Sequence, residues 1–516
     1  MDEVMFMIIE RPSEWKEGFI ERLENREPWD NWTLYNMSYE VVKKNLVTDF
    51  YGLQSPKYLP NLTPLTHQLK AAETVIERMN GKAILADEVG LGKTIEAGLI
   101  LKEYLVRGLV KKALILVPAS LVNQWIEELN QKFHIPAIQY KKSYDLNQCN
   151  IVIMSMDTAK RSPHKENIYN QDYDLIIIDE AHKLKNHKTK SYEFVQNLKK
   201  KFCLLLTATP IQNDVFELFY LISLLKPGHL GNYETFQSSF SASKHKVEHD
   251  EYLKELVNQV MVRNRRQDTG IEWTNRHVQI LPIDFTTEEK EVYDLISNLK
   301  NVSPVFSDAF SMITLQREMC SSKEATNLTL TKMREKCIRS EDVSYMDEII
   351  RKLMRLEINS KAEKAYEIIA QANDKVIIFT EYRASQTYLQ EYLHSKGITS
   401  VLFNGQFNKN KREWMKQLFK EKAQVLIATE SGSEGINLQF CHHVINYDLP
   451  WNPMKLEQRI GRVHRLGQEH DVHIYNLAIQ NTIEDHILDL LYVKIGVFEQ
   501  VVGELDDILS TFKESI

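Results

Sequence analysis

The chain has 516 residues, 43% of them hydrophobic and 26% charged, which is long enough for about three globular units. Its net charge of −7 excludes a globally basic nucleic-acid-binding protein, and its five scattered cysteines exclude a zinc ribbon and a disulfide framework. No apolar run is long enough to cross a bilayer and the first residues carry no basic signal, so we expect a cytoplasmic protein without a membrane partner.

Residues 1–60 alternate charged and aromatic positions and include Trp15, Trp29 and Trp32. Three tryptophans so close together predict a segment that packs on the first lobe rather than a disordered tail. Because aromatic side chains are enriched at interfaces, a docking surface for a partner protein is the alternative.

A first α/β unit is expected over residues 61–270. Its first helix carries Gln68, whose carboxamide offers a donor and an acceptor to the edge of adenine, although an ordinary surface glutamine is the alternative. The apolar run 83–86 predicts a buried strand, and helical spacing begins at Thr94. A ligand-binding loop is therefore expected between this strand and the helix.

That loop has the residues of a phosphate-binding loop. Two glycines let backbone amides approach an anion, and the helix that follows offers its positive N-terminus. Lys93 would reach the β- and γ-phosphates of ATP, and the Thr94 hydroxyl would bind Mg²⁺. The strict pattern has glycine at position 87, so a glycine turn before an ordinary helix is the alternative. The nucleotide contacts expected here are Asp87, Glu88, Gly90, Leu91, Gly92, Lys93 and Thr94.

The apolar run 175–178, rich in β-branched residues, predicts the central strand of a parallel sheet. Asp179 and Glu180 follow it, at the end where open α/β sheets bind their ligands. Asp179 would hold Mg²⁺ through water, and Glu180 would orient and deprotonate the attacking water. A solvated helix cap is the alternative for this acidic pair.

Thr207 and Thr209 follow another predicted strand, at 203–206, and are expected to relay the nucleotide state to a moving part. A local turn formed by their hydroxyls is compatible with that role. Helical spacing then predicts an insertion over about 214–262, and the basic turn 263–266 predicts either phosphate contact or docking between lobes. Residues 271–360 are expected to form a linker and a helical insertion.

A second α/β unit is expected over 361–485, with strands near 375–380, 400–403, 425–429 and 444–448, and a C-terminal helix over 486–516. Near its end, Gln458 is expected to contact the nucleotide. Arg462 and Arg465 are expected to share a helix face and to point into the cleft between the units. There they would neutralise charge on the transferring phosphoryl group, with a salt-bridged helix as the alternative.

In this order the motifs resemble helicase superfamily two and, more narrowly, the Swi/Snf family of ATP-dependent double-stranded DNA translocases. The segments that carry the resemblance are 87–94, 179–183, 206–213, 433–439 and 458–468. Asp87 in place of the first glycine is what that family carries. The segments 88–90 and 95–98 are similar to the bacterial RapA-like branch, which associates with RNA polymerase.

The resemblance implies an α/β fold of two RecA-like parallel-sheet lobes with helical insertions. It also implies contacts with the phosphates of double-stranded DNA, for which ordinary turn chemistry is the alternative. The residues concerned are Ser120, Gln124, Thr380, Asn404, Gly405, Thr429, Ser431 and Asn437.

We therefore expect a bacterial motor that hydrolyses ATP when its lobes close, moves along double-stranded DNA, and remodels DNA or protein–DNA complexes without separating strands. It would lie in the cytoplasm and on the nucleoid when bound. One alternative is a strand-separating helicase on DNA or RNA. The other is an ATP-gated nucleic-acid-binding subunit of a larger assembly, in phage defence or with RNA polymerase.

Overall fold

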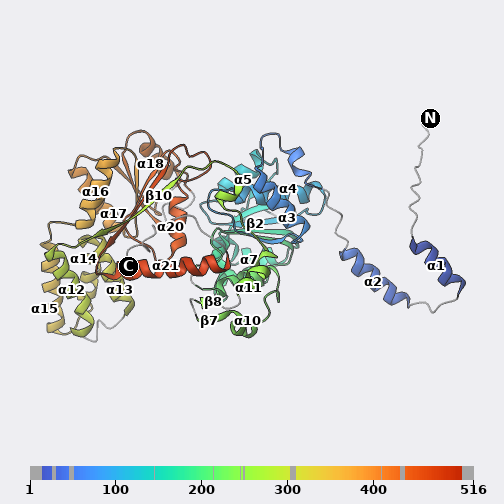
Figure 1. Ribbon diagram of the computed structural model, residues 1–516, viewed down its shortest axis with the longest axis horizontal. Helices are drawn as coiled ribbons and strands as arrows, with labels where there is room; N and C mark the ends of the chain where they lie inside the picture. The colour runs from blue at the N-terminus through green and yellow to red at the C-terminus, as the bar shows by residue number, and fades with distance from the viewer. Residues whose placement is uncertain are drawn as a thin grey trace. The chain divides into compact units, whose positions relative to one another are not determined.

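Strands and helices alternate along much of the chain, and most of the strands form two parallel sheets. Figure 1 shows them in the computed structural model. The structure describes residues 14–25, 31–45, 52–144, 146–212, 214–243, 246–247, 250–302, 309–407, 409–430, 436–502 and 509. It divides into two compact units, residues 1–52 and 53–516.

The first unit contains helices α1 (Glu14–Glu24) and α2 (Trp32–Asn45). On α2 the rings of Trp32, Tyr35 and Tyr39 stack in succession, with centroids 5.1 and 6.4 Å apart. These rings are exposed, Trp32 to 73%. Trp29 lies outside the described residues, and the packing of residues 1–60 on the first lobe stays a prediction.

The first lobe of the second unit is a parallel sheet of seven strands in the order β3-β4-β2-β5-β6-β1-β9. Its strands are β1 (Lys82–Leu85), β2 (Ala113–Val117), β3 (Ile138–Gln139), β4 (Ile151–Ser155), β5 (Tyr173–Asp179), β6 (Lys200–Leu206) and β9 (Met261–Val262). A short hairpin, β7 (Ser241–Ser243) with β8 (Lys246–Val247), lies in the insertion. The predicted strands of this lobe are confirmed, since continuous apolar runs form buried strands in parallel sheets.

The helices of this lobe fill most of the connections between its strands (Figure 1). They are η1 (Ser55–Tyr58), α3 (Thr66–Glu77), α4 (Lys93–Val106), α5 (Val122–Gln131), α6 (Met156–Ala159), α7 (His164–Tyr169), η2 (Ala181–Leu184), α8 (Lys190–Gln196), α9 (Phe216–Leu225), α10 (Tyr233–Phe240), α11 (Asp250–Asn258) and η3 (Arg266–Thr269).

The second lobe is a parallel sheet of six strands in the order β10-β15-β14-β11-β13-β12. These are β10 (Arg276–Ile283), β11 (Val376–Thr380), β12 (Ser400–Phe403), β13 (Val425–Thr429), β14 (His443–Asn446) and β15 (Val472–Ile479). Its helices are α12 (Thr287–Val302), α13 (Ala309–Ser321), α14 (Lys323–Arg334), α15 (Ser340–Met354), α16 (Ser360–Ala372), α17 (Arg383–Ser395), α18 (Lys409–Glu421), α20 (Pro453–Ile460) and α21 (Ile483–Val501).

β10 lies within the segment 271–360, where only a linker and helices were expected. It pairs in parallel with β15 over eight residues, from Arg276 with Val472 to Ile283 with Ile479. Because β10 is an edge strand it is mostly half-exposed and tolerates Pro282, so it lacks the continuous apolar run that marks the other strands. The helices after it share a buried core with the sheet, which includes Leu315, Ile349 and Ile427.

The C-terminal helix α21 contacts both lobes. It packs against α11 of the first lobe and against α13, α20 and β15 of the second. The guanidinium of Arg263, in the first lobe, lies 4.9 Å from the ring of Phe498, and Lys494 donates to the Trp451 carbonyl in the second. Among the described helices, none is long and apolar enough to span a membrane.

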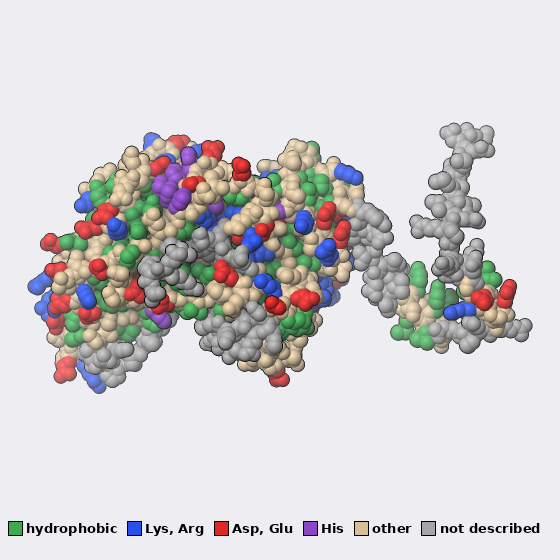
Figure 2. All heavy atoms as spheres, viewed as in Figure 1, with side chains coloured by type: hydrophobic (Ala, Val, Ile, Leu, Met, Phe, Trp, Pro, Cys, Tyr) green, Lys and Arg blue, Asp and Glu red, His purple; other side chains and the backbone are tan. Residues whose placement is uncertain are grey.

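Histidine side chains gather on the surface of the second lobe (Figure 2). Successive rings of His277, His473, His443, His442 and His470 lie 4.5 to 5.0 Å apart. They lie at or next to the N-terminal ends of β10, β14 and β15. This row is therefore at the opposite edge of the sheet from the residues predicted to contact ligands.

Candidate active site

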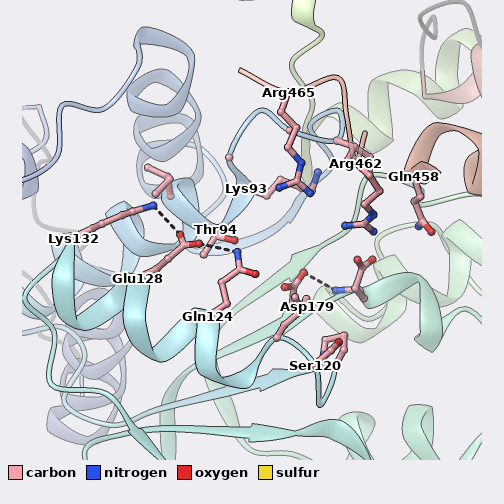
Figure 3. Close-up of a pocket in the computed structure, with 18 residues that line it drawn as sticks. Lys93, Thr94, Ser120, Gln124, Glu128, Lys132, Asp179, Gln458, Arg462 and Arg465 are labelled. Atoms are coloured by element: carbon pink, nitrogen blue, oxygen red, sulfur yellow. Dashed lines mark hydrogen bonds and ion pairs between the residues drawn. The ribbon is translucent and has the colours of Figure 1, made fainter. Parts of the chain in front are cut away.

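A pocket of about 280 Å³ lies where the two lobes meet (Figure 3). The first lobe lines it with the phosphate loop and with Asp179 and Glu180. The second lobe lines it with Gln458, Arg462 and Arg465. Residues almost three hundred positions apart in the chain, predicted separately to act on one triphosphate, are thus brought to one place.

The phosphate loop, residues 87–94, has the backbone shape that its glycines permit. Gly90 and Gly92 have φ angles of +97° and +94°, which side chains other than glycine rarely tolerate. The Lys93 ammonium donates to the carbonyls of Asp87, at 2.6 Å, and Glu88, at 3.2 Å. Burial lowers the pKa of Lys93, against the carboxylates around it.

Gln68 holds the phosphate loop from behind. Its amide Nε2 donates to the Leu91 carbonyl at 2.9 Å, and its Oε1 accepts from the backbone amide of Leu65 at 3.0 Å. A ring nitrogen of His67 lies 3.1 Å from the same Leu91 carbonyl. Gln68 is buried and does not line the pocket, so its contact with adenine stays a prediction.

The side chains of Asp87 and Glu88 do not line the pocket, so their contact with the nucleotide stays a prediction. Asp87 accepts from the backbone amide of Asn264 at 2.8 Å and from the Asn264 side chain. Glu88 Oε2 accepts from the backbone amide of Arg266 at 3.0 Å. These carboxylates anchor the turn after β9, because two buried charges without such donors would be costly. The basic turn 263–266 therefore packs on the phosphate loop rather than facing solvent.

Asp179 and Glu180 end β5 and line the pocket. Glu180 is the N-cap of η2, yet its side chain makes no capping hydrogen bond, so a helix cap does not account for Glu180. Its Oε2 lies 3.1 Å from Nδ1 of His182. Burial alone would raise the pKa of Glu180, but His182, Arg462 and Lys93 outweigh it and lower that pKa, so Glu180 is anionic. An anionic carboxylate is what a general base requires.

Trp125, on α5, holds the other carboxylate. Its indole Nε1 donates to Asp179 Oδ2 at 2.9 Å, while the backbone amide of Glu180 donates to Asp179 Oδ1 at 2.8 Å. Burial, with the charge of Glu180, nevertheless raises the pKa of Asp179 to about 6. Sequence reasoning gave Trp125 no role, because a contact across 54 positions leaves no local pattern.

Arg462 and Arg465 lie in the turns after α20, not on a helix, so the expected shared helix face is wrong. The helix ends at Ile460, and a Cβ at Gly461 would collide with Val89 of the phosphate loop. Both side chains still line the pocket and extend toward Lys93 and Asp179 (Figure 3). Burial and the charge of Arg462 lower the pKa of Arg465 to about 10.

Thr207 and Thr209 are buried beneath the pocket. The Thr207 hydroxyl accepts from the Thr209 amide at 3.0 Å, which is the local turn considered above. Gln212 links the Thr209 hydroxyl, at 3.1 Å, to the Lys185 ammonium, at 2.6 Å, just after η2. This chain of contacts leads from Thr209 toward Glu180 and His182. The coupling role stays a prediction.

The residues expected to contact DNA fall into three groups. Ser120 and Gln124 line the nucleotide pocket itself. Thr380 and Thr429 are neighbours at the ends of β11 and β13 and are buried, so their contact with phosphates stays a prediction that their burial does not support. The Thr380 hydroxyl instead donates to Asp448 at 2.6 Å.

The third group is accessible at the pocket end of the second sheet. Gly405 and Asn437 are exposed, and Asn404, after β12, is half-buried. Ser431 lies outside the described residues. Next to Gly405, α18 carries the exposed Lys411 and Trp414, and Arg412 donates to the Gly405 carbonyl at 3.2 Å. Sequence reasoning missed this basic stretch, although its run of Lys and Arg beside Gly405 was a visible signal.

The chain matches the SNF2-related domain family over residues 67–343 and the helicase conserved C-terminal domain over 360–467. It is 60% identical over 501 residues to the uncharacterized ATP-dependent helicase YqhH of Bacillus subtilis, covering 96% of this chain and 90% of that protein. It is 27% identical over 464 residues to the RNA polymerase-associated protein RapA of Haemophilus influenzae, covering 84% of this chain and 47% of RapA. The chain thus spans about half the length of RapA.

Among solved structures, the Hef helicase domain of Pyrococcus furiosus aligns with a TM-score of 0.53 and 18% identity, over 82% of this chain and 97% of that chain. At this identity the likeness concerns the fold. It agrees with the fold of two parallel-sheet lobes.

Proposed function

We propose, from the premise that this chain belongs to the SNF2-related family of ATP-dependent helicases, that it is a motor that moves along double-stranded DNA and remodels DNA or protein–DNA complexes without separating strands. As a member of that family it hydrolyses ATP. The observation that carries the proposal is the pocket in which Lys93 and Glu180 of one lobe face Arg462 and Arg465 of the other. Such a pocket is complete only when both lobes contribute, so hydrolysis depends on their relative position.

In the proposed mechanism the first lobe binds and activates. Lys93 leaves its carbonyl partners and contacts the β- and γ-phosphates, while Glu180, held anionic, takes a proton from the attacking water. The Thr94 hydroxyl and the Asp179 carboxylate are oxygen donors of the kind that Mg²⁺ prefers, and both line the pocket. Bound there, Mg²⁺ would neutralise phosphate charge.

The second lobe completes the site. Arg462 and Arg465 contact the γ-phosphate and stabilise the charge that builds up on it during transfer. Gln458 lies beside them at the same pocket. DNA that contacts both lobes favours their productive arrangement and so raises the rate of hydrolysis.

Duplex DNA as the substrate is supported by the family and by the accessible residues of the second lobe. Gly405, Asn437 and the exposed Lys411 suit contacts with the DNA backbone, which position a protein without reading sequence. Lys411, with Arg412 beside it on α18, also provides the local basic surface that a chain of net charge −7 needs.

The test is ATP turnover with blunt duplex DNA, single-stranded DNA and RNA, together with displacement of a third strand from a triplex and of one strand from a duplex. We expect stimulation by the duplex and displacement of the third strand only. Glu180→Gln is the matched control, because it should bind ATP and fail in both assays. Separation of the two duplex strands would instead show a strand-separating helicase.

An ATP-gated subunit of a larger DNA-bound assembly, with RNA polymerase as one proposed partner, is the second candidate. The exposed ring stack of Trp32, Tyr35 and Tyr39 on α2 favours it, because aromatic side chains are enriched where proteins dock. The test is recovery of RNA polymerase on the immobilised chain and on a Trp32→Ser/Tyr35→Ser variant. Equal recovery of RNA polymerase on both proteins, or no recovery on either, would contradict this candidate and favour a motor that acts alone.

A further inference from the structure

The segment that joins the two lobes, residues 266–276, contacts both halves of the pocket; we call it the strap. At its start, Arg266 donates to the Val89 carbonyl in the phosphate loop. The same guanidinium lies 3.3 Å from Oε1 of Glu457, on α20 of the second lobe. Arg266 is only 2% exposed, so one buried cation joins the phosphate loop to the helix that precedes the two arginines.

At the end of the strap, Arg276 contacts the arginine loop, residues 461–467. It binds Glu457 with both terminal nitrogens, at 2.7 and 2.9 Å, and its Nε donates to Nδ1 of His464 at 2.8 Å. The other ring nitrogen of His464 lies 3.0 Å from the Thr274 carbonyl. A neutral imidazole protonated on Nε2 satisfies both contacts.

His464 is the residue that anchors the arginine loop. It is 2% exposed, stands between Arg462 and Arg465 in the chain, and packs edge-on against Trp273 of the strap. Burial, with the charges of Arg276 and Arg266, lowers the pKa of His464 to about 3, so it is neutral at pH 7. Its ring therefore adds no charge of its own beside the two pocket arginines.

The ion cluster is buried throughout, which makes its geometry well defined. Glu457 is 3% exposed and its pKa is lowered to about 2, because Arg276 and Arg266 outweigh the effect of burial. Removal of one member would leave the others charged and without part of their pairing in a site that excludes water. The phosphate loop and the arginine loop are thus held in register although they belong to different lobes.

We propose that Arg266, Glu457 and His464 are positioning residues, which hold the arginine loop against the phosphate loop so that Arg462 and Arg465 reach the γ-phosphate. The strap would then act as the pivot between the lobes, and the arginine loop would be docked on the phosphate loop in the productive arrangement of the lobes. This role rests on the proposed action of Arg462 and Arg465 in hydrolysis.

The experiment compares ATP turnover, ATP binding and thermal unfolding in the full chain for Arg266→Gln, His464→Ala and the conservative His464→Gln. A misplaced catalytic group costs about 10²-fold in rate, so kcat should fall by roughly 10- to 100-fold in the first two variants while Kd for ATP stays within about threefold. His464→Gln should recover part of kcat, since its amide can accept from Arg276 and donate to Thr274.

The matched control is Lys361→Met, which breaks another buried ion pair, that of Lys361 with Glu484 at 2.5 Å. This pair contacts neither loop, so its loss should lower the unfolding temperature with kcat per folded molecule unchanged. If Lys361→Met lowered kcat as much as His464→Ala at the same loss of stability, the proposal would be overturned. A wild-type kcat in Arg266→Gln would also overturn it.

Double variants separate the strap from the arginines on which it acts. If the strap works through Arg465, Arg266→Gln should slow an Arg465→Ala protein by less than about threefold, because the two changes remove one effect. If the losses of kcat in the two single variants instead added up in the double variant, the strap would not act through Arg465, although Arg465 would keep its role in hydrolysis. Full turnover in Arg465→Ala alone would reject the arginine role itself.

Discussion

The two lobes share one architecture and use their sheet edges differently. In the first lobe the ends of β1 and β5 lead into the phosphate loop and the acidic pair, whose functional groups reach the pocket. In the second lobe the corresponding ends of β11 and β13 carry Thr380 and Thr429, which are buried. The second lobe contributes to the pocket from the end of α20 and from the turns after it instead. The C-terminal ends of the strands in a parallel sheet can bind a ligand. Whether they do so depends on the side chains that stand there.

The largest effect that would test this division is expected from Arg465→Ala. Removal of an arginine that stabilises the transferring phosphoryl group costs about 10³- to 10⁵-fold in rate. We expect turnover with saturating duplex DNA to fall in that range while ATP binding stays within a few fold. Arg465→Lys should lie between, because an ammonium keeps the charge but not the planar fork. Undiminished turnover in the alanine variant would mean that Arg465 does not stabilise the transferring phosphoryl group.

Glu180→Gln tests the first lobe. Loss of a general base costs about 10²- to 10⁴-fold, and the isosteric amide keeps the shape of the site. Turnover should fall accordingly, and a fluorescent ATP analogue should bind as before. A loss of binding that matched the loss of turnover would assign Glu180 to the grip on the nucleotide rather than to the water.

Trp125→Phe tests how the acidic pair is held. A smaller aromatic ring replaces the indole and the hydrogen bond to Asp179 is lost, so the Mg²⁺ concentration for half-maximal turnover should rise about 10- to 100-fold, as for other partners of metal ligands. Tyr169→Phe is the matched control, because it also removes one aromatic donor from the first lobe, its bond to the Phe194 carbonyl. An equal shift in both variants would contradict a specific role for Trp125.

The smallest effect is expected from Thr380→Val. Asp448 would keep the Glu381 amide and the Ser321 hydroxyl as donors, so the free energy of unfolding should fall by only about 1–2 kcal/mol. Stimulation of turnover by duplex DNA should be unchanged, whereas Lys411→Ala should raise the DNA concentration for half-maximal stimulation. If Thr380→Val removed the stimulation in a folded protein, the buried edge of the second sheet would be a DNA contact after all.

The sequence allowed prediction of the parts that follow from local chemistry. The buried strands appear as apolar runs, and the phosphate loop and the acidic pair carry their residue types at fixed spacing. β10 was missed because an edge strand is half-exposed and lacks that run. The helix expected at Arg462 ends at Ile460, and Gly461 after it lies so close to Val89 that a Cβ would collide, which no local pattern indicates.

Contacts with distant parts of the chain also decide where other predicted side chains lie. Asp87 and Glu88 belong to the motif, but Asn264 and Arg266, more than 170 positions away, decide where their carboxylates point. Thr380 and Thr429 are polar and follow strands, which is also true of residues that bind ligands. Only their burial tells the two cases apart, and burial depends on packing between distant elements.

The helix α21 limits how far the two lobes can part. Its 19 residues make it about 28 Å long, with Lys494 fastened to Trp451 and Phe498 resting under Arg263 at its far end. Because α21 is attached to both lobes, it resists their separation. Opening of the lobes would therefore require its last turn to shift along the first lobe or to detach from it. The amide protons of that turn should therefore exchange with solvent faster during ATP turnover than in the resting protein. Hydrogen exchange at the end of α21 would then report how far the lobes open.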